Sequence, residues 1–246
     1  MSEHSMPQCW HRESKPHRFC PGCGHGLVLK ALGLAVDELG LAERIIFACD
    51  IGCSLLAWDF FTFPCMQTHH GRTIPVMVGL KRASPDRIVV AYMGDGGGYS
   101  IGLQHLISAA QRHDPITAVL VNNTVYAMTG GQMAPTTLPG QRTETTPFGR
   151  DEADTGRPFR GPETLAAVAH PRAYLARGTV ARVPRLKNMI REALERQLQG
   201  DFAFVEALST CPTNWRTSAA ETWSFLEQEM GSYYRPGEIA VAREED

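Results

Sequence analysis

The chain has 246 residues, of which 24 are Lys or Arg and 26 are Asp or Glu, so its formal net charge is -2. A chain of this length buries a sizeable core in one domain, and its charge leaves no positive surplus for nucleic-acid binding. No apolar run has the roughly 20 residues that cross a bilayer, and the polar N-terminus lacks a signal-peptide segment. We therefore expect a cytoplasmic protein without a membrane span.

Helices and strands alternate along the predicted chain. An amphipathic helix begins after Gly24 and stops at Gly40, and an apolar strand follows from Ile45 to Cys49. The later predicted elements are a strand at Ile88–Met93, a helix at about Ser100–His113, a strand at Thr117–Val121, a short helix at Glu163–Ala169, a strand at Tyr174–Val180, a helix at Pro184–Gln199 and a strand at Phe202–Leu208. This order predicts an α/β fold, a mostly parallel sheet with helices on both faces.

Two segments depart from the alternation. Residues 124–162 are rich in Gly, Pro and Thr without a sustained period, and a loop of this length is usually functional. The segment after Cys211 is rich in aromatic residues, which are Trp215, Trp223, Phe225, Tyr233 and Tyr234. Such an aromatic content predicts docking, and we expect the segment to pack on another subunit.

Polar residues follow two of the predicted strands. Asp95 lies in a glycine-rich turn after Met93, and Asn123 closes the next predicted strand. One helix and one strand separate the two residues, so a right-handed crossover places both at the carboxyl ends of parallel strands. Carboxylate and amide oxygens suit Mg²⁺, and the glycines admit a phosphate close to the start of a helix. The pattern predicts a magnesium diphosphate site, although a flexible turn beside a polar strand end is the structural alternative.

Cysteine spacing points to a metal centre. Cys20 and Cys23 have the C-x-x-C spacing that lets both sulfurs reach one centre. Because no second C-x-x-C follows, the remaining ligands must come from isolated cysteines. Cys53 and Cys211 both follow predicted strands, at the edge of the sheet where the magnesium site is expected.

The other three cysteines are weaker candidates for metal ligands. Cys49 falls in an apolar strand, which favours a buried thiol. Cys65 could replace Cys53 as a ligand. Cys9 lies in a terminus that we expect to be mobile.

Several segments, in one order, resemble the β subunit of a 2-oxoacid:ferredoxin oxidoreductase, which binds thiamine diphosphate. They are FCPGCGHG from Phe19, IGCS from Ile51, HGR from His70, GDGGG from Gly94, NNTVYAMTGGQMAPTTLPGQ from Asn122 and ALSTCPTNW from Ala207. The resemblance runs from Phe19 to about Trp215 and implies a thiamine diphosphate-binding fold. It divides the chain into an N-terminal extension (1–18), a domain for thiamine diphosphate and a [4Fe-4S] cluster (19–210) and a C-terminal docking segment (211–246).

The resemblance implies three sets of site residues. Mg²⁺ would be held by Asp95, Asn123 and the backbone oxygen of Val125. The [4Fe-4S] cluster would be ligated by Cys20, Cys23, Cys53 and Cys211. The positions expected around thiamine diphosphate are Gly52, Ser54, His70, Gly94, Gly96, Gly97, Tyr126, Met128 and Thr129. Of these, His70 is the one candidate catalytic residue.

The activity implied is the oxidative decarboxylation of a 2-oxoacid with coenzyme A, which yields acyl-CoA, CO₂ and low-potential electrons for ferredoxin or another acceptor. The glutamate that thiamine catalysis needs has no candidate in this chain, and in the family an α subunit supplies it. The resemblance therefore implies an α subunit, with γ and ferredoxin-like δ subunits often present. The chain departs from many relatives at Gly97, where they place an acidic residue.

The segments MTGGQMAPTTLPGQ, PFGRD and STCPTNW resemble the branch that acts on 2-oxoisovalerate and other branched or bulky oxoacids. The 2-oxoglutarate branch and the aryl (phenylglyoxylate-type) branch are alternatives. For a dicarboxylate, Arg142, Arg150 or Arg157 could supply a cation from the long loop. Two further alternatives are a non-redox thiamine lyase or synthase, which needs no such cysteines, and a zinc-stabilised interaction subunit without catalysis.

Overall fold

The computed structural model describes residues 6–241, so residues 1–5 of the predicted extension and 242–246 of the predicted docking segment lie outside the described part. A seven-stranded sheet of order β2-β1-β3-β4-β8-β7-β9 forms its centre. Its strands are β1 (Ile45–Cys49), β2 (Cys65–Gln67), β3 (Ile88–Gly94), β4 (Thr117–Asn122), β7 (Tyr174–Thr179), β8 (Ala203–Leu208) and β9 (Gly237–Glu238). Each neighbouring pair is parallel except β7 with β9, which confirms the predicted α/β class.

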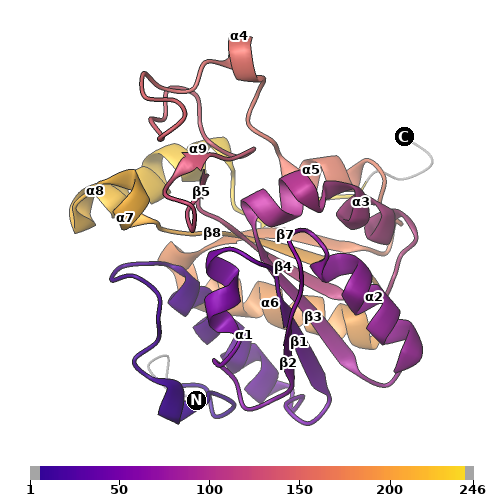
Figure 1. Cartoon of the computed structure of the whole chain (residues 1–246). Helices are drawn as coiled ribbons and strands as arrows, with labels where there is room; N and C mark the ends of the chain where they lie inside the picture. Colours follow the sequence, from indigo (N-terminus) through magenta and orange to yellow (C-terminus); the bar gives the residue numbers. More distant parts are fainter. Residues whose placement is uncertain (1–5, 242–246) are drawn as a thin grey trace.

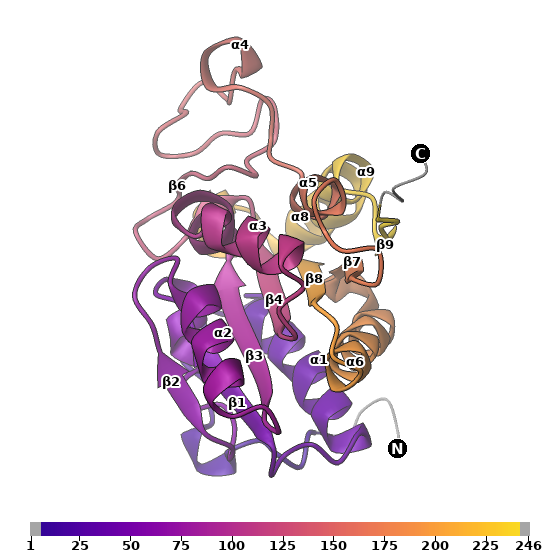
Figure 2. The same cartoon turned by 90° about the vertical axis from the view of Figure 1, so that its right-hand side faces the viewer.

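Helices cover both faces of this sheet (Figures 1 and 2). One face carries α1 (His25–Glu38) and α6 (Val183–Leu198), and the other carries α2 (Thr73–Ala83), α3 (Leu103–Gln111) and α5 (Gly161–Ala166). Along β3, Val90 and Tyr92 belong to the first core and Val89 and Ala91 to the second. This division follows from the alternation of side chains along a strand. Each face therefore has its own hydrophobic core.

The structure contains elements that the sequence analysis missed or misassigned. β2 and α2 fill the region between the first and second predicted strands. Pro75 lies in the first turn of α2, where a missing N–H costs no hydrogen bond. The glycine-rich segment that we predicted as a turn is a π-helical segment, η3 (Gly97–Ile101), which leads into α3. Short 3-10 segments are η1 (Arg12–Ser14), η2 (Cys53–Ala57) and η4 (Val180–Arg182).

The long loop of residues 124–162 has an organised base and projects away from the sheet (Figure 1). It contains an antiparallel pair, β5 (Val125–Tyr126) with β6 (Gln132–Met133), and the short helix α4 (Glu152–Thr155). Arg150 is 5% exposed and donates hydrogen bonds to the carbonyls of Pro135 and Thr137, at 3.0 and 2.6 Å. This guanidinium therefore holds the loop together, and the suggestion that Arg150 is free to bind a substrate carboxylate was wrong.

Both ends of the described chain pack against the chain itself. Cys9, which we expected in a mobile terminus, is 4% exposed, and its Sγ lies 3.5 Å from the carbonyl oxygen of Gly33. The C-terminal segment forms α7 (Pro212–Trp215), α8 (Ala219–Ser224), η5 (Phe225–Met230) and α9 (Gly231–Tyr233). Tyr234 is fully buried, and its hydroxyl donates to the carbonyl of Thr136 at 2.7 Å. Part of the aromatic content thus docks on the long loop of the same chain.

No helix in residues 6–241 is both long and apolar enough to cross a membrane.

Candidate cofactor site

Four neighbouring strands bring the candidate residues to one edge of the sheet. β1, β3, β4 and β8 are consecutive and parallel, so their carboxyl ends lie side by side. Asp95 directly follows β3 and Asn123 directly follows β4, and these strands are neighbours as the sequence spacing predicted. Cys53 follows the turn after β1, and Cys211 lies shortly after β8. The fold therefore gathers oxygen and sulfur groups that are far apart in sequence.

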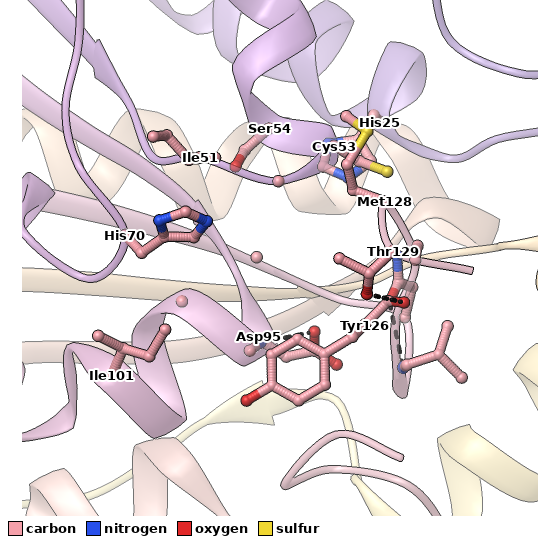
Figure 3. A pocket seen from close by; sticks show the side chains of 17 residues that line it. His25, Ile51, Cys53, Ser54, His70, Asp95, Ile101, Tyr126, Met128 and Thr129 are labelled. Carbon is pink, nitrogen blue, oxygen red and sulfur yellow. Dashed lines mark hydrogen bonds between the residues drawn. The ribbon is translucent and has the colours of Figure 1, made fainter. Parts of the chain in front are cut away.

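One pocket at this edge contains all the residues expected around magnesium and thiamine diphosphate (Figure 3). These are Gly52, Ser54, His70, Gly94, Asp95, Gly96, Gly97, Asn123, Val125, Tyr126, Met128 and Thr129. His25, Ile51, Cys53, Ile101 and Ala127 complete the lining. Figure 3 shows His70 and Ile51 across the pocket from Met128 and Thr129. The pocket holds about 610 Å³ of empty space, open solvent included.

Asp95 is a buried carboxylate held at both oxygens. It is 3% exposed, its Oδ1 accepts from the backbone N–H of Gly96 at 2.8 Å, and its Oδ2 accepts from the hydroxyl of Thr136 at 2.5 Å. Burial raises the pKa of Asp95 to about 7, against the hydrogen bonds that favour the ionised form. A cation beside this carboxylate would offset the cost of its buried charge. The residue thus has the environment of a ligand that is stabilised by a metal.

The turn after β4 has an unusual backbone. Thr124 is fully buried and has φ of 63°, a left-handed conformation that is costly for a β-branched residue. Its N–H donates to Oδ1 of Asn122 at 3.1 Å, which helps to hold the turn. The strained residue stands between Asn123 and Val125, both of which line the pocket. Strain of this kind concentrates at functional sites.

The glycines of η3 and its approach allow close packing at the pocket floor. A Cβ on Gly96 would lie 2.2 Å from Cε1 of Tyr126, and a Cβ on Gly97 would lie 1.8 Å from Oδ2 of Asp50. Oδ1 of Asp50 accepts from the N–H of Gly71 at 2.9 Å, whereas its buried Oδ2 has no hydrogen-bond partner. Burial raises the pKa of Asp50 to about 6. Tyr126 and Asp50 can therefore pack this closely on the backbone between β3 and α3 only because these positions are glycine.

This donor set fits a magnesium diphosphate. The carboxylate of Asp95, the amide of Asn123 and the backbone at Val125 line the same pocket, and all three residues are at least 95% buried. Hard oxygen ligands in small number suit Mg²⁺, which takes its other ligands from phosphates and water. The residues present can therefore hold the group that the resemblance implies.

A second pocket contains four thiols. Cys20, Cys23, Cys53 and Cys211 all line it, together with Phe19, Leu56, Asn123, Ala127, Met128, Pro212, Thr213 and Asn214. Burial raises the pKa of the Cys23 and Cys53 thiols to about 12, and nearby thiols add to the shift. An iron centre reverses this effect, because a coordinating thiol loses its proton.

The arrangement of the four thiols suits a cluster of several iron atoms better than a single metal ion. No group of three or more His, Cys, Asp or Glu side chains in the described part of the chain is arranged to hold a metal ion. The four thiols line one pocket, and the sulfur ligands of a four-iron cage stand farther apart than those of one ion. Cys65 does not replace Cys53, because its Sγ lies 3.8 Å from Sγ of Cys49, away from this pocket. Cys49 is fully buried, as predicted.

The two pockets share part of their walls. Cys53, Asn123, Ala127 and Met128 line both. The short helix α7, which follows Cys211, also contacts the turn after β4, because the indole N–H of Trp215 donates to the carbonyl of Asn123 at 3.0 Å. The oxygen groups and the thiols are therefore parts of one site.

Sequence analysis missed several residues that shape this site. His25 lines the first pocket, where its Nδ1 lies 2.7 Å from the hydroxyl of Tyr92, and burial lowers its pKa to about 3. Thr136 and Asp50 have no recognisable signal of their own in the sequence, although Thr136 bonds to Asp95 and Asp50 packs against Gly97 at the pocket floor. Thr136 lies in the quoted segment MAPTTLPG, so its motif was visible but its partner, Asp95, was not. Neither Arg142 nor Arg157 lines the first pocket.

Comparison with known families gives an independent match. Residues 50–207 match the model of the thiamine pyrophosphate enzymes, C-terminal thiamine pyrophosphate-binding domain. The matched segment runs from the turn after β1 into β8 and therefore includes both Asp95 and Asn123.

Individual relatives agree with this match. The chain is 44% identical over 216 residues to the ketoisovalerate oxidoreductase subunit VorA of Methanothermobacter thermautotrophicus, a match that covers 86% of this chain and 45% of that relative. It is 36% identical over 216 residues to the 2-oxoglutarate synthase subunit KorB of Archaeoglobus fulgidus, covering 88% of this chain and 78% of that relative. The chain thus spans somewhat less than half the length of the VorA relatives.

A solved structure has the same fold over nearly the whole chain. The 2-oxoglutarate:ferredoxin oxidoreductase from Magnetococcus marinus, with 2-oxoglutarate, coenzyme A and succinyl-CoA bound, is similar with a TM-score of 0.79 and 28% identity. The match covers 98% of this chain and 86% of the other. The similarity therefore includes the segments before and after the family match.

Proposed function

The chain belongs to the thiamine pyrophosphate-binding subunits of the 2-oxoacid:ferredoxin oxidoreductase family, and on this premise we propose that it is the β subunit of such an enzyme. In this role it binds thiamine diphosphate, Mg²⁺ and one [4Fe-4S] cluster. The complex converts a branched or bulky 2-oxoacid and coenzyme A to acyl-CoA and CO₂, and the electrons leave through the cluster.

The shared wall of the two pockets is the observation that carries this proposal. Cys53, Asn123, Ala127 and Met128 each line both the oxygen-rich pocket and the thiol pocket. An enzyme that only cleaves or forms carbon–carbon bonds has no use for four thiols beside its coenzyme. A redox enzyme needs a short distance between the coenzyme and the first electron acceptor. The common wall supports the redox function.

The residues of the chain have separate tasks in this proposal. Asp95, Asn123 and the carbonyl of Val125 hold Mg²⁺ and thereby the diphosphate, and Thr136 orients the carboxylate of Asp95. Thiamine diphosphate, when bound, supplies the electron sink for the loss of CO₂. Ser54 donates its hydroxyl to the carbonyl of Asp50 at 2.9 Å and so fixes the turn before Cys53.

The part of the pocket beyond the metal ligands would receive the substrate. His70 lines this part and remains the candidate catalytic residue of this chain. The apolar wall of the pocket, which includes Ile51, Ile101 and Met128, suits the branched aliphatic side chain of a 2-oxoacid substrate. The higher identity to the VorA relative, 44% against 36% for the KorB relative, supports the same substrate class.

A partner subunit is part of the proposal. Ile101 and Met128 line the pocket but are 45% and 47% exposed, so the pocket has an apolar rim open to a partner. The glutamate that activates the thiamine ring would come from an α subunit that covers this rim. Further γ and ferredoxin-like δ subunits, and ferredoxin as the final acceptor, complete the expected assembly. We expect this chain to be inactive alone.

The test is the cofactor content of the complex purified without oxygen. A [4Fe-4S] cluster and one coenzyme predict about four irons and one thiamine diphosphate for each copy of this chain, in addition to any iron that a ferredoxin-like subunit carries. One zinc without thiamine would instead favour a structural interaction subunit. Thiamine without iron would favour a non-redox lyase or synthase, and either result would reject the proposal.

Turnover of the same complex identifies the substrate. The assay supplies coenzyme A, an artificial dye as electron acceptor and one oxoacid at a time. We expect the highest kcat/KM with 2-oxoisovalerate, and lower values with 2-oxoglutarate, phenylglyoxylate and pyruvate. A clear preference for 2-oxoglutarate would keep the enzyme class and reject the proposed substrate branch.

A further inference from the structure

The side chain of Asn214 links the thiol pocket to the wall of the coenzyme pocket. Asn214 lies in α7, three residues after Cys211, and is half-buried. Its Nδ2 donates to the carbonyl oxygen of Ala127 at 2.9 Å and to the Sγ of Cys211 at 3.5 Å. Ala127 lines both pockets. One amide group thus contacts an expected cluster ligand and the shared wall at the same time.

The hydrogen-bond partners define the orientation of this amide. A backbone carbonyl can only accept, so the nitrogen and not the oxygen of the amide must face Ala127. The second N–H of the same nitrogen then points at the sulfur of Cys211. A thiolate bound to iron carries negative charge and accepts such a bond more strongly than a thiol does. The contact would therefore strengthen when a cluster is bound.

Neighbouring contacts keep Asn214 in place. The indole of the next residue, Trp215, donates to the carbonyl of Asn123, which fixes α7 to the turn after β4. On the other side, a Cβ built on Gly131 would lie 3.0 Å from Cβ of Asn214, so the long loop packs directly against this residue. The amide is therefore preorganised, and no rearrangement is needed for it to reach the sulfur.

We propose, on the premise of the function stated above, that Asn214 is a positioning residue that raises the reduction potential of the cluster. Reduction adds negative charge to the iron-sulfur cage and to its thiolate ligands. A fixed N–H donor at one ligand sulfur stabilises the reduced form more than the oxidised form. Asn214 thus eases electron transfer into the cluster.

Redox titration of the anaerobically purified complex tests this role. The midpoint potential is followed by the electron paramagnetic resonance signal of the reduced cluster in the wild type, Asn214→Leu, Asn214→Ala and Asn188→Ala. Leu keeps the branched shape of Asn without a donor, and Ala removes the amide without adding bulk. Asn188 is an exposed asparagine of α6 that lines neither pocket of the site, and Asn188→Ala serves as the matched control.

We expect both Asn214 variants to titrate at a lower potential than the wild type and Asn188→Ala to titrate at the wild-type potential. The resonance signal comes only from molecules that hold a cluster, so partial iron loss does not obscure the result. Wild-type potentials in both Asn214 variants would overturn the inference and leave the proposed function intact. A wild-type complex without any cluster signal would instead reject the proposed function itself.

Discussion

The carboxylate of Asp50 occupies the space that a side chain at position 97 would need. Oδ2 of Asp50 lies 1.8 Å from the position of a Cβ built on Gly97. The family resemblance led us to expect an acidic residue directly after Gly-Asp-Gly, where this chain has Gly97. Here the neighbouring strand β1 brings a carboxylate to the same place. The two residues therefore form a matched pair.

Substitution of Gly97 tests this pairing. Gly97→Ala should lower the free energy of unfolding by about 1–3 kcal/mol, because the methyl group must displace a buried carboxylate. Urea unfolding measures the loss. Gly94→Ala is the control, since a Cβ there meets no atom within 4 Å. Adding Asp50→Gly to Gly97→Ala should recover part of the loss, and a double variant no better than Gly97→Ala would argue against the pairing.

Asp95→Asn should abolish the magnesium-dependent retention of thiamine diphosphate. The substitution keeps the volume of the side chain but removes the negative charge that Mg²⁺ requires. The coenzyme and iron contents of the purified complex are measured together, and iron should stay near the wild-type value because the four thiols are unchanged. Full coenzyme occupancy in this variant would exclude Asp95 as a metal ligand.

Thr136→Val should weaken coenzyme binding without abolishing it. The hydroxyl of Thr136 donates to Oδ2 of Asp95 at 2.5 Å, and loss of such an outer partner of a metal ligand typically costs about 10–100-fold in affinity. Titration of coenzyme-free complex with thiamine diphosphate at saturating Mg²⁺ gives the dissociation constant. Thr137→Val is the informative neighbour, since its hydroxyl donates instead to the carbonyl of Thr124. An unchanged constant in Thr136→Val would mean that Asp95 is positioned by other contacts.

A buried ion pair supports the sheet behind the proposed metal ligands. Arg177 and Glu206 are at most 1% exposed and pair with each other, and Asn122 donates to Glu206 at 2.9 Å. Glu206→Gln should cost about 1.5–3 kcal/mol, because it replaces a charged acceptor of the buried guanidinium of Arg177 with a neutral one while Glu163 remains as a carboxylate partner. Thermal or urea unfolding measures the effect. The matched variant Glu192→Gln breaks a surface pair with Arg196 and should cost about 0.5 kcal/mol or less.

Asp201 should make stability depend on pH at the opposite edge of the sheet. Burial alone would raise the pKa of Asp201, but hydrogen bonds from Arg172 and His113 outweigh it and hold the pKa below its usual value. An acid with a lowered folded-state pKa contributes stability at neutral pH and loses that contribution as pH falls through the folded pKa.

The variant Asp201→Asn measures this contribution. At pH 7 it should lower the free energy of unfolding by about 1–2 kcal/mol, the loss of charge-assisted hydrogen bonds. The difference from the wild type should shrink as pH falls below about 4, the ordinary pKa of Asp in an unfolded chain. Urea unfolding at several pH values checks this, with exposed Asp154→Asn as the reference. A loss that stays constant with pH would contradict the role of the charge.

The strand ends could be predicted from sequence because they depend on local pattern. Apolar runs gave β3, β4 and β8 nearly to the residue, and parallel topology then brought Asp95 and Asn123 together. α2 was missed because Pro75 and Gly79 weaken its helical pattern. Its stability comes instead from the packing of residues such as Met77 in the second core.

Contacts between distant segments could not be read in this way. Thr136 reaches Asp95 from a loop without periodicity, and Tyr234 reaches Thr136 from the C-terminal segment. Neither contact leaves a signal in residue spacing. Asn214 was visible in the quoted segment STCPTNW, but its two acceptors become apparent only when α7 is seen beside Ala127.

The distribution of the four thiols along the chain imposes an order on biosynthesis. Cys20 and Cys23 precede the first strand of the sheet, whereas Cys211 follows β8, the strand that completes the parallel centre of the sheet. A nascent chain could therefore offer all four thiols to the proposed cluster only after translation has passed Cys211. Delivery of iron and sulfide to the full ligand set would follow the synthesis of β8, and a product that stops just after β8 would retain the parallel strands while lacking one of the four sulfurs.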